Sequence, residues 1–242
     1  MIDRFSKEGA RQLLRTQLGR IRAVKHPSLA DNQDPRLKSL QQWQQARLAS
    51  TYGDIRSTLR FGPACEFFIN DLYGPQDFSQ RDANVERIFP IMVRILPGPV
   101  LGTVAQAVEL DALSHELDRA VAQALVPGEE LSSSSVYARA YCAGTSMAAR
   151  RHQLALLLTL GRELDRLVRK PLLWELLRLC RWPARIAGLG ELQSFLERGF
   201  DAFKKLNGAG DFLRHIAQRE KEFMQQMHAL TPDARPPESS GQ

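Results

Sequence analysis

The chain has 242 residues, of which 43% are hydrophobic and 25% are charged, and its formal net charge is +6. This composition is enough for an ordinary buried core and predicts a globular protein. The longest apolar stretch, residues 154–161, is far shorter than the roughly 20 residues of a membrane span, which excludes a transmembrane helix. The N-terminal residues carry a cation every few positions and do not resemble an export signal, so a cytoplasmic location is expected.

Helices are predicted along the whole chain, because apolar residues recur at helical spacing and no segment alternates with period two. Ser6 is expected to cap a first helix that ends near Val24, and Asp34 followed by Pro35 predicts the start of a second. Asp77 is expected to cap a helix that Pro90 kinks or breaks. Further helices are expected at residues 62–72, 100–125, 133–142, 146–169, 171–181, 189–206 and 211–230.

The fold class that follows is all-α, a single compact bundle of about eight to ten helices. Its central member is expected at about 146–169, where apolar residues surround much of the helix circumference. We predict one domain over residues 1–230, with a loosely packed N-terminal helical hairpin at residues 1–60. A disordered tail is expected at residues 231–242, which lack apolar content.

Charge is unevenly distributed along the chain. Residues 1–26 contain seven Lys and Arg against two acids, and residues 136–185 contain ten against three. Residues 62–135 contain only four against eleven acids. Either a basic segment binds an anionic partner, or basic and acidic segments face each other within the fold. Both interpretations stay open at this point.

The residue types that carry chemistry form no recognisable site. Cys65, Cys142 and Cys180 are far apart, odd in number and without a histidine pattern, which favours reduced thiols in the core. No glycine loop for phosphate, dinucleotide fingerprint or nucleophile turn occurs. The sequence therefore predicts no catalytic residue and no cofactor.

Two Asp–His pairs are candidate metal ligands. Asp111 and His115 are four residues apart, as are Asp211 and His215, so each pair shares one helical face. A di-metal site in a bundle also needs inward-facing glutamates on several helices, and no such set can be assembled here. We therefore expect local Asp–His contacts and no metal.

The most suggestive feature is a basic segment that begins in the predicted central helix. Its leucines alternate with cations, and Trp174 and Trp182 lie among them. This pattern suits an acidic protein partner, and also an anionic membrane surface. Nucleic acid is disfavoured because Glu163, Asp165 and Glu175 interrupt the positive charge. The candidate surface for an anionic partner comprises Arg162, Arg166, Arg169, Lys170, Arg178, Arg181 and Arg185.

The stretch "FFINDLYG" at Phe67–Gly74, with "DFSQRD" and "ERIFPIMVRILP" after it, resembles the signature of a family of uncharacterised bacterial proteins called FFLEELY proteins. Matching motifs continue from about Ala30 to the C-terminal region: "LDALSHELD", "GRELDRLVRKPLL", "PARIAGLGELQSFLERGFDAF" and "FLRHIAQRE". This chain has "INDLY" where the family name spells "LEELY". The resemblance implies a helical cytoplasmic protein and no known activity or catalytic residues.

The aromatic residues of that motif are predicted to be core. Phe68 and Leu72 are four apart on one helix face, Ala64 extends the same stripe and Phe67 flanks it.

The leading functional hypothesis is a binding or scaffolding protein that binds an acidic partner through the basic segment. The alternatives are an enzyme or small-molecule binder with a pocket between helices, and peripheral association with an anionic membrane. The oligomeric state is not predicted.

Overall fold

The structure is a computed structural model that describes residues 6–26, 28–72, 89–90, 92–94, 96–129, 131 and 133–231. These residues form helices joined by turns and contain no strand, which confirms the all-α fold class. The predicted cap at Asp77 and residues 232–242 of the predicted tail lie outside the described residues. The division into one domain and a tail stays a prediction.

The order of the described elements follows the chain from N- to C-terminus. They are α1 (Lys7–Lys25), η1 (Ala30–Gln33), α2 (Pro35–Thr51), α3 (Gly53–Arg56), α4 (Gly62–Glu66), a π-helical segment η2 (Phe67–Leu72), α6 (Gly98–Ala124), α7 (Ser134–Gly144), α8 (Met147–Val168), α9 (Pro171–Leu179), α10 (Arg181–Ile186), α11 (Gly190–Lys205) and α12 (Gly210–Ala229).

Side-chain caps start the helices where small polar residues were expected to do so. The amide of Gly9 donates to Ser6 Oγ at 3.0 Å, which satisfies an otherwise unpaired donor at the start of α1. The Asp34 carboxylate accepts from the amide of Arg36 at 2.8 Å, and Pro35 occupies the first helical position of α2. Both predicted helix starts are confirmed.

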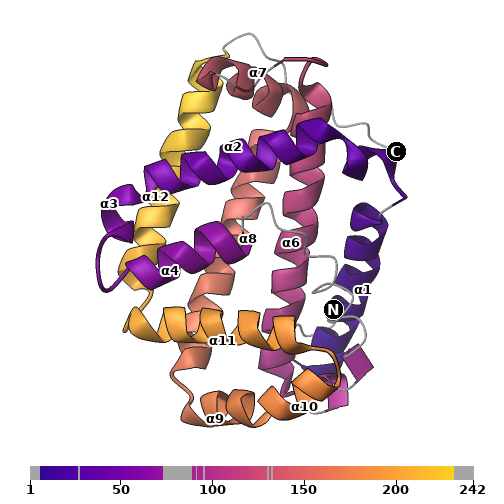
Figure 1. Cartoon of the computed structure of the whole chain (residues 1–242), viewed down its shortest axis with the longest axis vertical. Coiled ribbons are helices and arrows are strands. Elements are labelled where there is room, and N and C mark those ends of the chain that lie inside the picture. Colours follow the sequence, from indigo (N-terminus) through magenta and orange to yellow (C-terminus); the bar gives the residue numbers. More distant parts are fainter. Residues whose placement is uncertain are drawn as a thin grey trace.

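The long helices α6 and α8 lie at the centre of the molecule (Figure 1). The first contacts α1, α2, α7 and α8, and the second contacts α9, α11 and α12 in addition to α6. The interior has two apolar clusters, and α6 contributes to both while α8 contributes to the larger one. The predicted central helix is thus one of a central pair.

The smaller cluster joins α1 to the N-terminal half of α6. Leu14 and Ile21 of α1 are buried there against Leu101 and Ala105 of α6. The larger cluster includes side chains from α2, α4, α7, α8, α11 and α12 together with the C-terminal half of α6. The functional features described below lie at or beside this larger cluster.

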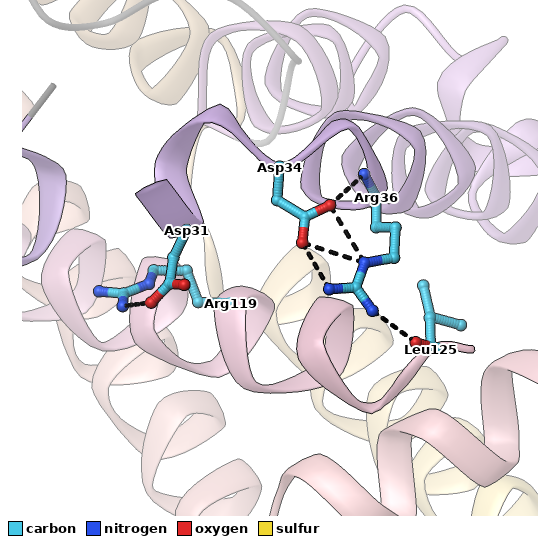
Figure 2. A network of polar contacts seen from close by, with 5 residues as sticks. All are labelled: Asp31, Asp34, Arg36, Arg119 and Leu125. Atoms are coloured by element: carbon cyan, nitrogen blue, oxygen red, sulfur yellow. Dashed lines mark hydrogen bonds and ion pairs between the residues drawn. The ribbon is translucent and has the colours of Figure 1, made fainter. Parts of the chain in front are cut away.

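Polar contacts at one corner connect the segment between α1 and α2 to α6 (Figure 2). Arg36 donates to the Asp34 carboxylate at 2.7 Å and to the carbonyl of Leu125, just after α6, at 2.6 Å. Asp31 of η1 forms an ion pair with Arg119 of α6. These contacts and the smaller apolar cluster hold α1 and α2 on the bundle, while loose packing of residues 1–60 stays a prediction.

The aromatic motif belongs to the core, as expected. Ala64, Phe67 and Phe68 are buried, and the partly buried Leu72 packs against the larger cluster. Phe67 lies directly over Gly199 of α11, where an added Cβ would come within 2.7 Å of its ring. A glycine is therefore needed at that position for α11 to approach the motif so closely.

Candidate interaction surface

The basic segment occupies the C-terminal part of α8 and the short helices α9 and α10. Figure 1 shows α9 and α10 end to end along one edge of the molecule, beneath α11. The helix predicted at 171–181 is divided from α10 at Cys180, because Pro183 has no amide to donate to the Leu179 carbonyl. The result is a kinked rod that packs on the bundle with one side only.

The inner side of this rod contacts α11. The Trp174 ring stacks on Phe200 with 5.0 Å between centroids, and the Gln193 amide donates to the Leu177 carbonyl at 2.7 Å. Leu173 and Leu177 are half-buried, but no residue of α9 or α10 is fully buried. The two helices therefore cover the bundle without belonging to its core.

The outer side carries large apolar residues that face solvent. The exposed fractions are 82% for Leu172, 43% for Leu176, 75% for Leu179, 73% for Trp182 and 65% for Ile186. Their spacing of three or four residues places them along one helical face, which we call the apolar stripe. Single exposed apolar residues are normal on a protein, but a contiguous row of them marks a binding site.

All seven cations of the predicted surface are exposed, and three of them form ion pairs. Arg166 pairs with Glu163 and Arg169 pairs with Asp165, both within α8. Arg181 donates to both Glu197 oxygens at 2.6 and 2.7 Å, joining α10 to α11. Hydrogen bonds from Arg181 lower the pKa of Glu197, which keeps this carboxylate ionised.

The other four cations have no ion-pair partner within the described part of the chain. Arg162 donates only to the Thr159 hydroxyl, at 2.9 Å. Lys170, Arg178 and Arg185 are exposed and make no ion pair with a described residue. Arg178 lies on α9 and Arg185 on α10, and each directly precedes a residue of the apolar stripe in the sequence. Across the described residues, none of the seven cations pairs with an acid of the segment 62–135.

A groove of about 440 Å³ opens on the flank of α9, between the ends of α8 and α11 and the turn that follows α11. Arg169 and Lys204 lie on its wall together with Asp165 and Glu175. The Lys204 ammonium lies 5.7 Å from the centre of the Trp174 ring, within range of a cation–π contact. The groove thus offers cations beside an aromatic floor, next to the apolar stripe.

The sequence profile of a family described as "Domain of unknown function (DUF8198)" matches residues 24–234. The chain belongs to the DUF8198 family. No curated protein and no solved structure matches it. In the described residues of this DUF8198 chain, no helix is both long and apolar enough to cross a membrane.

The Asp–His pairs of the DUF8198 chain make contacts with other residues. Asp111 pairs with Lys25 at 2.7 Å, the His115 ring is hydrogen-bonded to Asn32 at 2.8 Å, and the charge of Asp111 also acts on His115. Asp211 pairs with arginines, and His215 lies edge-to-face against an aromatic ring. The predicted local Asp–His contacts stay a prediction. Among the described residues no group of three or more His, Cys, Asp or Glu could hold a metal ion.

The cysteines of the DUF8198 chain have different environments. Cys65 and Cys142 are buried and Cys180 is half-buried, and all three are free thiols. Burial raises the pKa of Cys65 to about 11, which keeps this thiol protonated and unreactive. Cys65 and Cys142 therefore behave as the small core residues that were expected.

One cation of functional interest was missed in the sequence. Arg150 is only 7% exposed and lies on α8 among the larger apolar cluster of this DUF8198 chain. A signal was present, because Arg150, Leu154 and Leu157 follow helical spacing and place a cation on the apolar face. The identity of its neighbours could not be predicted, since they come from helices far apart in the sequence.

Proposed function

We propose that this DUF8198 chain is a binding protein that holds an acidic, amphipathic segment of a protein partner on the apolar stripe. The observation that carries the proposal is the exposed apolar row of α9 and α10, with Lys170, Arg178 and Arg185 beside it and without ion pairs in the described residues. A partner with apolar residues on one helix face and acids next to them complements both features.

The two features contribute in different ways. Burying one Leu or Ile side chain fully is worth about 1.5–3 kcal/mol, so a partner that covers the stripe gains most of its affinity there. Tryptophan and arginine are the residues on which binding energy concentrates at interfaces, and Trp182 with Arg178 supplies both types. The cations mainly accelerate association and select for a negatively charged partner.

Glu175 favours a protein over an anionic membrane as the partner. This exposed carboxylate lies three residues after Leu172 and four before Leu179, and therefore on the apolar face itself. Anionic lipids would repel it and the apolar layer would desolvate it, whereas a protein can offer it a lysine or arginine. Membrane association is kept as an outcome of the test.

The experiment uses a photo-crosslinking amino acid at Trp182, in the stripe, and at Leu230 as a matched exposed position at the end of α12. We expect position 182 alone to capture a protein, through a segment whose acids outnumber its cations. The affinity of the purified partner is then measured with two double variants, Leu179→Ser/Trp182→Ser and Arg178→Gln/Arg185→Gln.

The apolar double variant should weaken binding roughly tenfold or more at any salt concentration, because the loss of buried area is not screened. The charge double variant should weaken it at low salt and little at high salt. Leu59→Ser, at a fully exposed position of another region, is the control and should not change the affinity.

Capture of a basic segment, or unchanged binding by the apolar double variant, would contradict the proposal. If the protein sediments with anionic vesicles and this depends on Trp182, the partner is a membrane and not a protein.

The buried Arg150 favours the second candidate, a small-molecule binder with a pocket between helices. Its geometry is independent of the apolar stripe and is developed below. An enzymatic role for that pocket stays a hypothesis.

We also propose that the chain is one of the bacterial FFLEELY proteins and acts in the cytoplasm. The motif "FFINDLYG" and the series of motifs after it support the family name. Free thiols at all three cysteines are compatible with a reducing compartment. Cell fractionation with an antibody to the protein tests the location, and recovery in a secreted or membrane fraction would contradict it.

A further inference from the structure

A polar cavity of about 60 Å³ lies inside the larger apolar cluster, where α2, α6, α7, α8 and α12 meet. Its wall combines charged and hydroxyl groups with apolar side chains. The polar members are Gln44, Arg47, Asp118, Tyr137, Tyr141, Arg150, Gln153 and Glu220. By this measure of volume a single water needs only about 10–15 Å³, so the cavity has room for a small organic molecule.

Arg150 is held in this wall by contacts to two of its three nitrogens. Its Nε donates to the Thr145 hydroxyl at 3.3 Å and its Nη1 to the Gln153 oxygen at 3.0 Å. Gln153 is oriented in turn by a hydrogen bond to Ser114. The guanidinium also lies 4.6 Å from the centre of the Tyr141 ring. Nη2 is buried and has no hydrogen-bond partner among the described residues.

Arg150 also has no ion pair among the described residues. No described carboxylate lies within ion-pair distance of it, although the side chain is more than nine-tenths buried, and Asp118 of the same wall acts on it through its charge only. The other cation of the wall, Arg47, is already paired with Glu220 at 2.6 Å, and Glu220 accepts a second bond from Tyr52. A buried cation without a counter-charge is strongly unfavourable, so an anion beside Arg150 would stabilise the fold.

The remaining polar groups of the wall offer mostly donors. The hydroxyl of Tyr141 makes no hydrogen bond to a described residue, and that of Tyr137 accepts from Gln44 at 3.3 Å. Burial raises the pKa of both tyrosines, so both hydroxyls keep their protons. The two carboxyl groups of the wall already accept hydrogen bonds: Asp118, whose pKa is raised by burial, accepts from Gln44 at 3.0 Å, and Glu220 accepts from Arg47 and Tyr52. A ligand group that only accepts hydrogen bonds, such as a carboxylate, therefore suits the donors of this wall best.

The charged groups of the wall favour a monoanion over a dianion as the ligand. Arg150 is the wall cation without an ion pair among the described residues, and the acids Asp118 and Glu220 of the same wall repel a second negative charge. The rest of the wall is apolar and includes Leu154, Leu157 and Met224, which suits a short hydrocarbon chain. Arg47 and Glu220 of the wall each keep 17% of the side chain exposed.

We propose that this cavity binds a small monocarboxylate. Its carboxylate accepts hydrogen bonds from Arg150 Nη2 and the Tyr141 hydroxyl, and its alkyl group lies against the leucines of α8. This site does not depend on the apolar stripe, which lies at the other end of α8.

The test measures binding of sodium acetate, butyrate and phosphate by isothermal calorimetry and thermal shift, with sodium chloride at matched ionic strength as the reference. We expect butyrate to bind more tightly than acetate, because its longer chain covers the apolar wall. We expect phosphate to behave like chloride, because the wall cannot neutralise a dianion. Equal effects of all four salts, or phosphate as the tightest ligand, would overturn the proposal.

Variants assign the binding to the cavity. Arg150→Met removes the charge but keeps the bulk, and it should weaken butyrate binding roughly tenfold or more. Arg162→Met, at an exposed arginine of the same helix, should leave binding unchanged. If Arg150→Met does not fold, Tyr141→Phe removes one hydroxyl alone and should weaken binding severalfold. Wild-type affinity in Tyr141→Phe and Arg150→Met, or a crystal structure grown in butyrate with only water in the cavity, would overturn the site.

Discussion

The two basic segments of the chain have similar sequences and opposite surroundings. In α1 the apolar face, with Leu14 and Ile21, is buried on α6, and Arg20 and Lys25 pair with Glu116 and Asp111 of the acidic segment. In α9 and α10 the apolar face points to solvent, and the cations make no pair with that segment in the described residues. A basic amphipathic helix is thus part of the fold in one case and a free surface in the other.

The difference lies in what the rest of the chain can supply. The helix α6 carries its acids next to small apolar residues such as Ala105 and Ala112, so α1 can approach it closely and neutralise its charge there. The helices α9 and α10 pack against α8 and α11, where Asp165 pairs with Arg169 and Glu197 pairs with Arg181, so the acids there bind other cations of the same segment. The interpretation in which basic and acidic segments face each other within the fold therefore holds for α1, and binding of an anionic partner by the other segment stays a prediction.

The largest expected effect is the loss of apolar burial in α1. Leu14→Ala should destabilise the protein by about 2–5 kcal/mol, because Leu14 is fully buried and its removal leaves a cavity. Leu179→Ala, at a 75% exposed position of the stripe, should change stability by no more than about 0.5 kcal/mol. Urea unfolding monitored by circular dichroism measures both. Similar losses for the two variants would mean that the stripe is packed in solution.

The second expected effect is a dependence of stability on pH that originates beside α1. Burial, reinforced by Lys25 and Arg119, lowers the pKa of His115 to about 4, while Asp111 opposes the shift. The unfolded chain takes up a proton at about pH 6.5, which the folded protein does not accept until about pH 4. The contribution of neutral His115 to stability is therefore complete above pH 6.5 and declines as the pH falls toward 4.

His115→Gln should remove this part of the pH dependence, because glutamine does not titrate. His152→Gln, at an exposed histidine of α8, should retain it. The free energy of unfolding of each variant is compared with that of the wild type at several pH values. The carboxylates are the same in all three proteins, so their contribution cancels in the difference. Parallel curves for the wild type and His115→Gln between pH 6.5 and 4 would contradict the assignment.

The smallest expected effect concerns the ion pair between α1 and α6. Glu116→Gln leaves Arg20 without its counter-charge, and since both side chains are about one-third exposed, the loss should be about 0.5–1 kcal/mol and smaller in high salt. Glu175→Gln, which removes an unpaired carboxylate from the stripe, should leave stability unchanged. Denaturant titrations at two salt concentrations distinguish the two. A salt-independent loss for Glu116→Gln would indicate a packing defect instead.

Local features of the sequence predicted the local structure well. Ser6 and Asp34 identified helix starts because a short polar side chain satisfies amides within its own turn. Ala64, Phe68 and Leu72 are four residues apart, and this helical spacing identified the face that packs into the core. The predicted single helix at 171–181 missed the break at Cys180, since its cause is Pro183 two residues beyond the predicted end.

The sequence by itself determined the all-α class and most helix positions, because these depend on residues within one or two turns of each other. Only the tertiary structure decided which amphipathic faces are covered, since covering one requires a second helix from a distant part of the chain. It also decided that Arg150 meets two tyrosines and a carboxyl group from other helices without finding an ion pair. The apolar stripe is exposed because no described helix covers it, and the polar cavity holds a cation, Arg150, for which no described acid forms an ion pair.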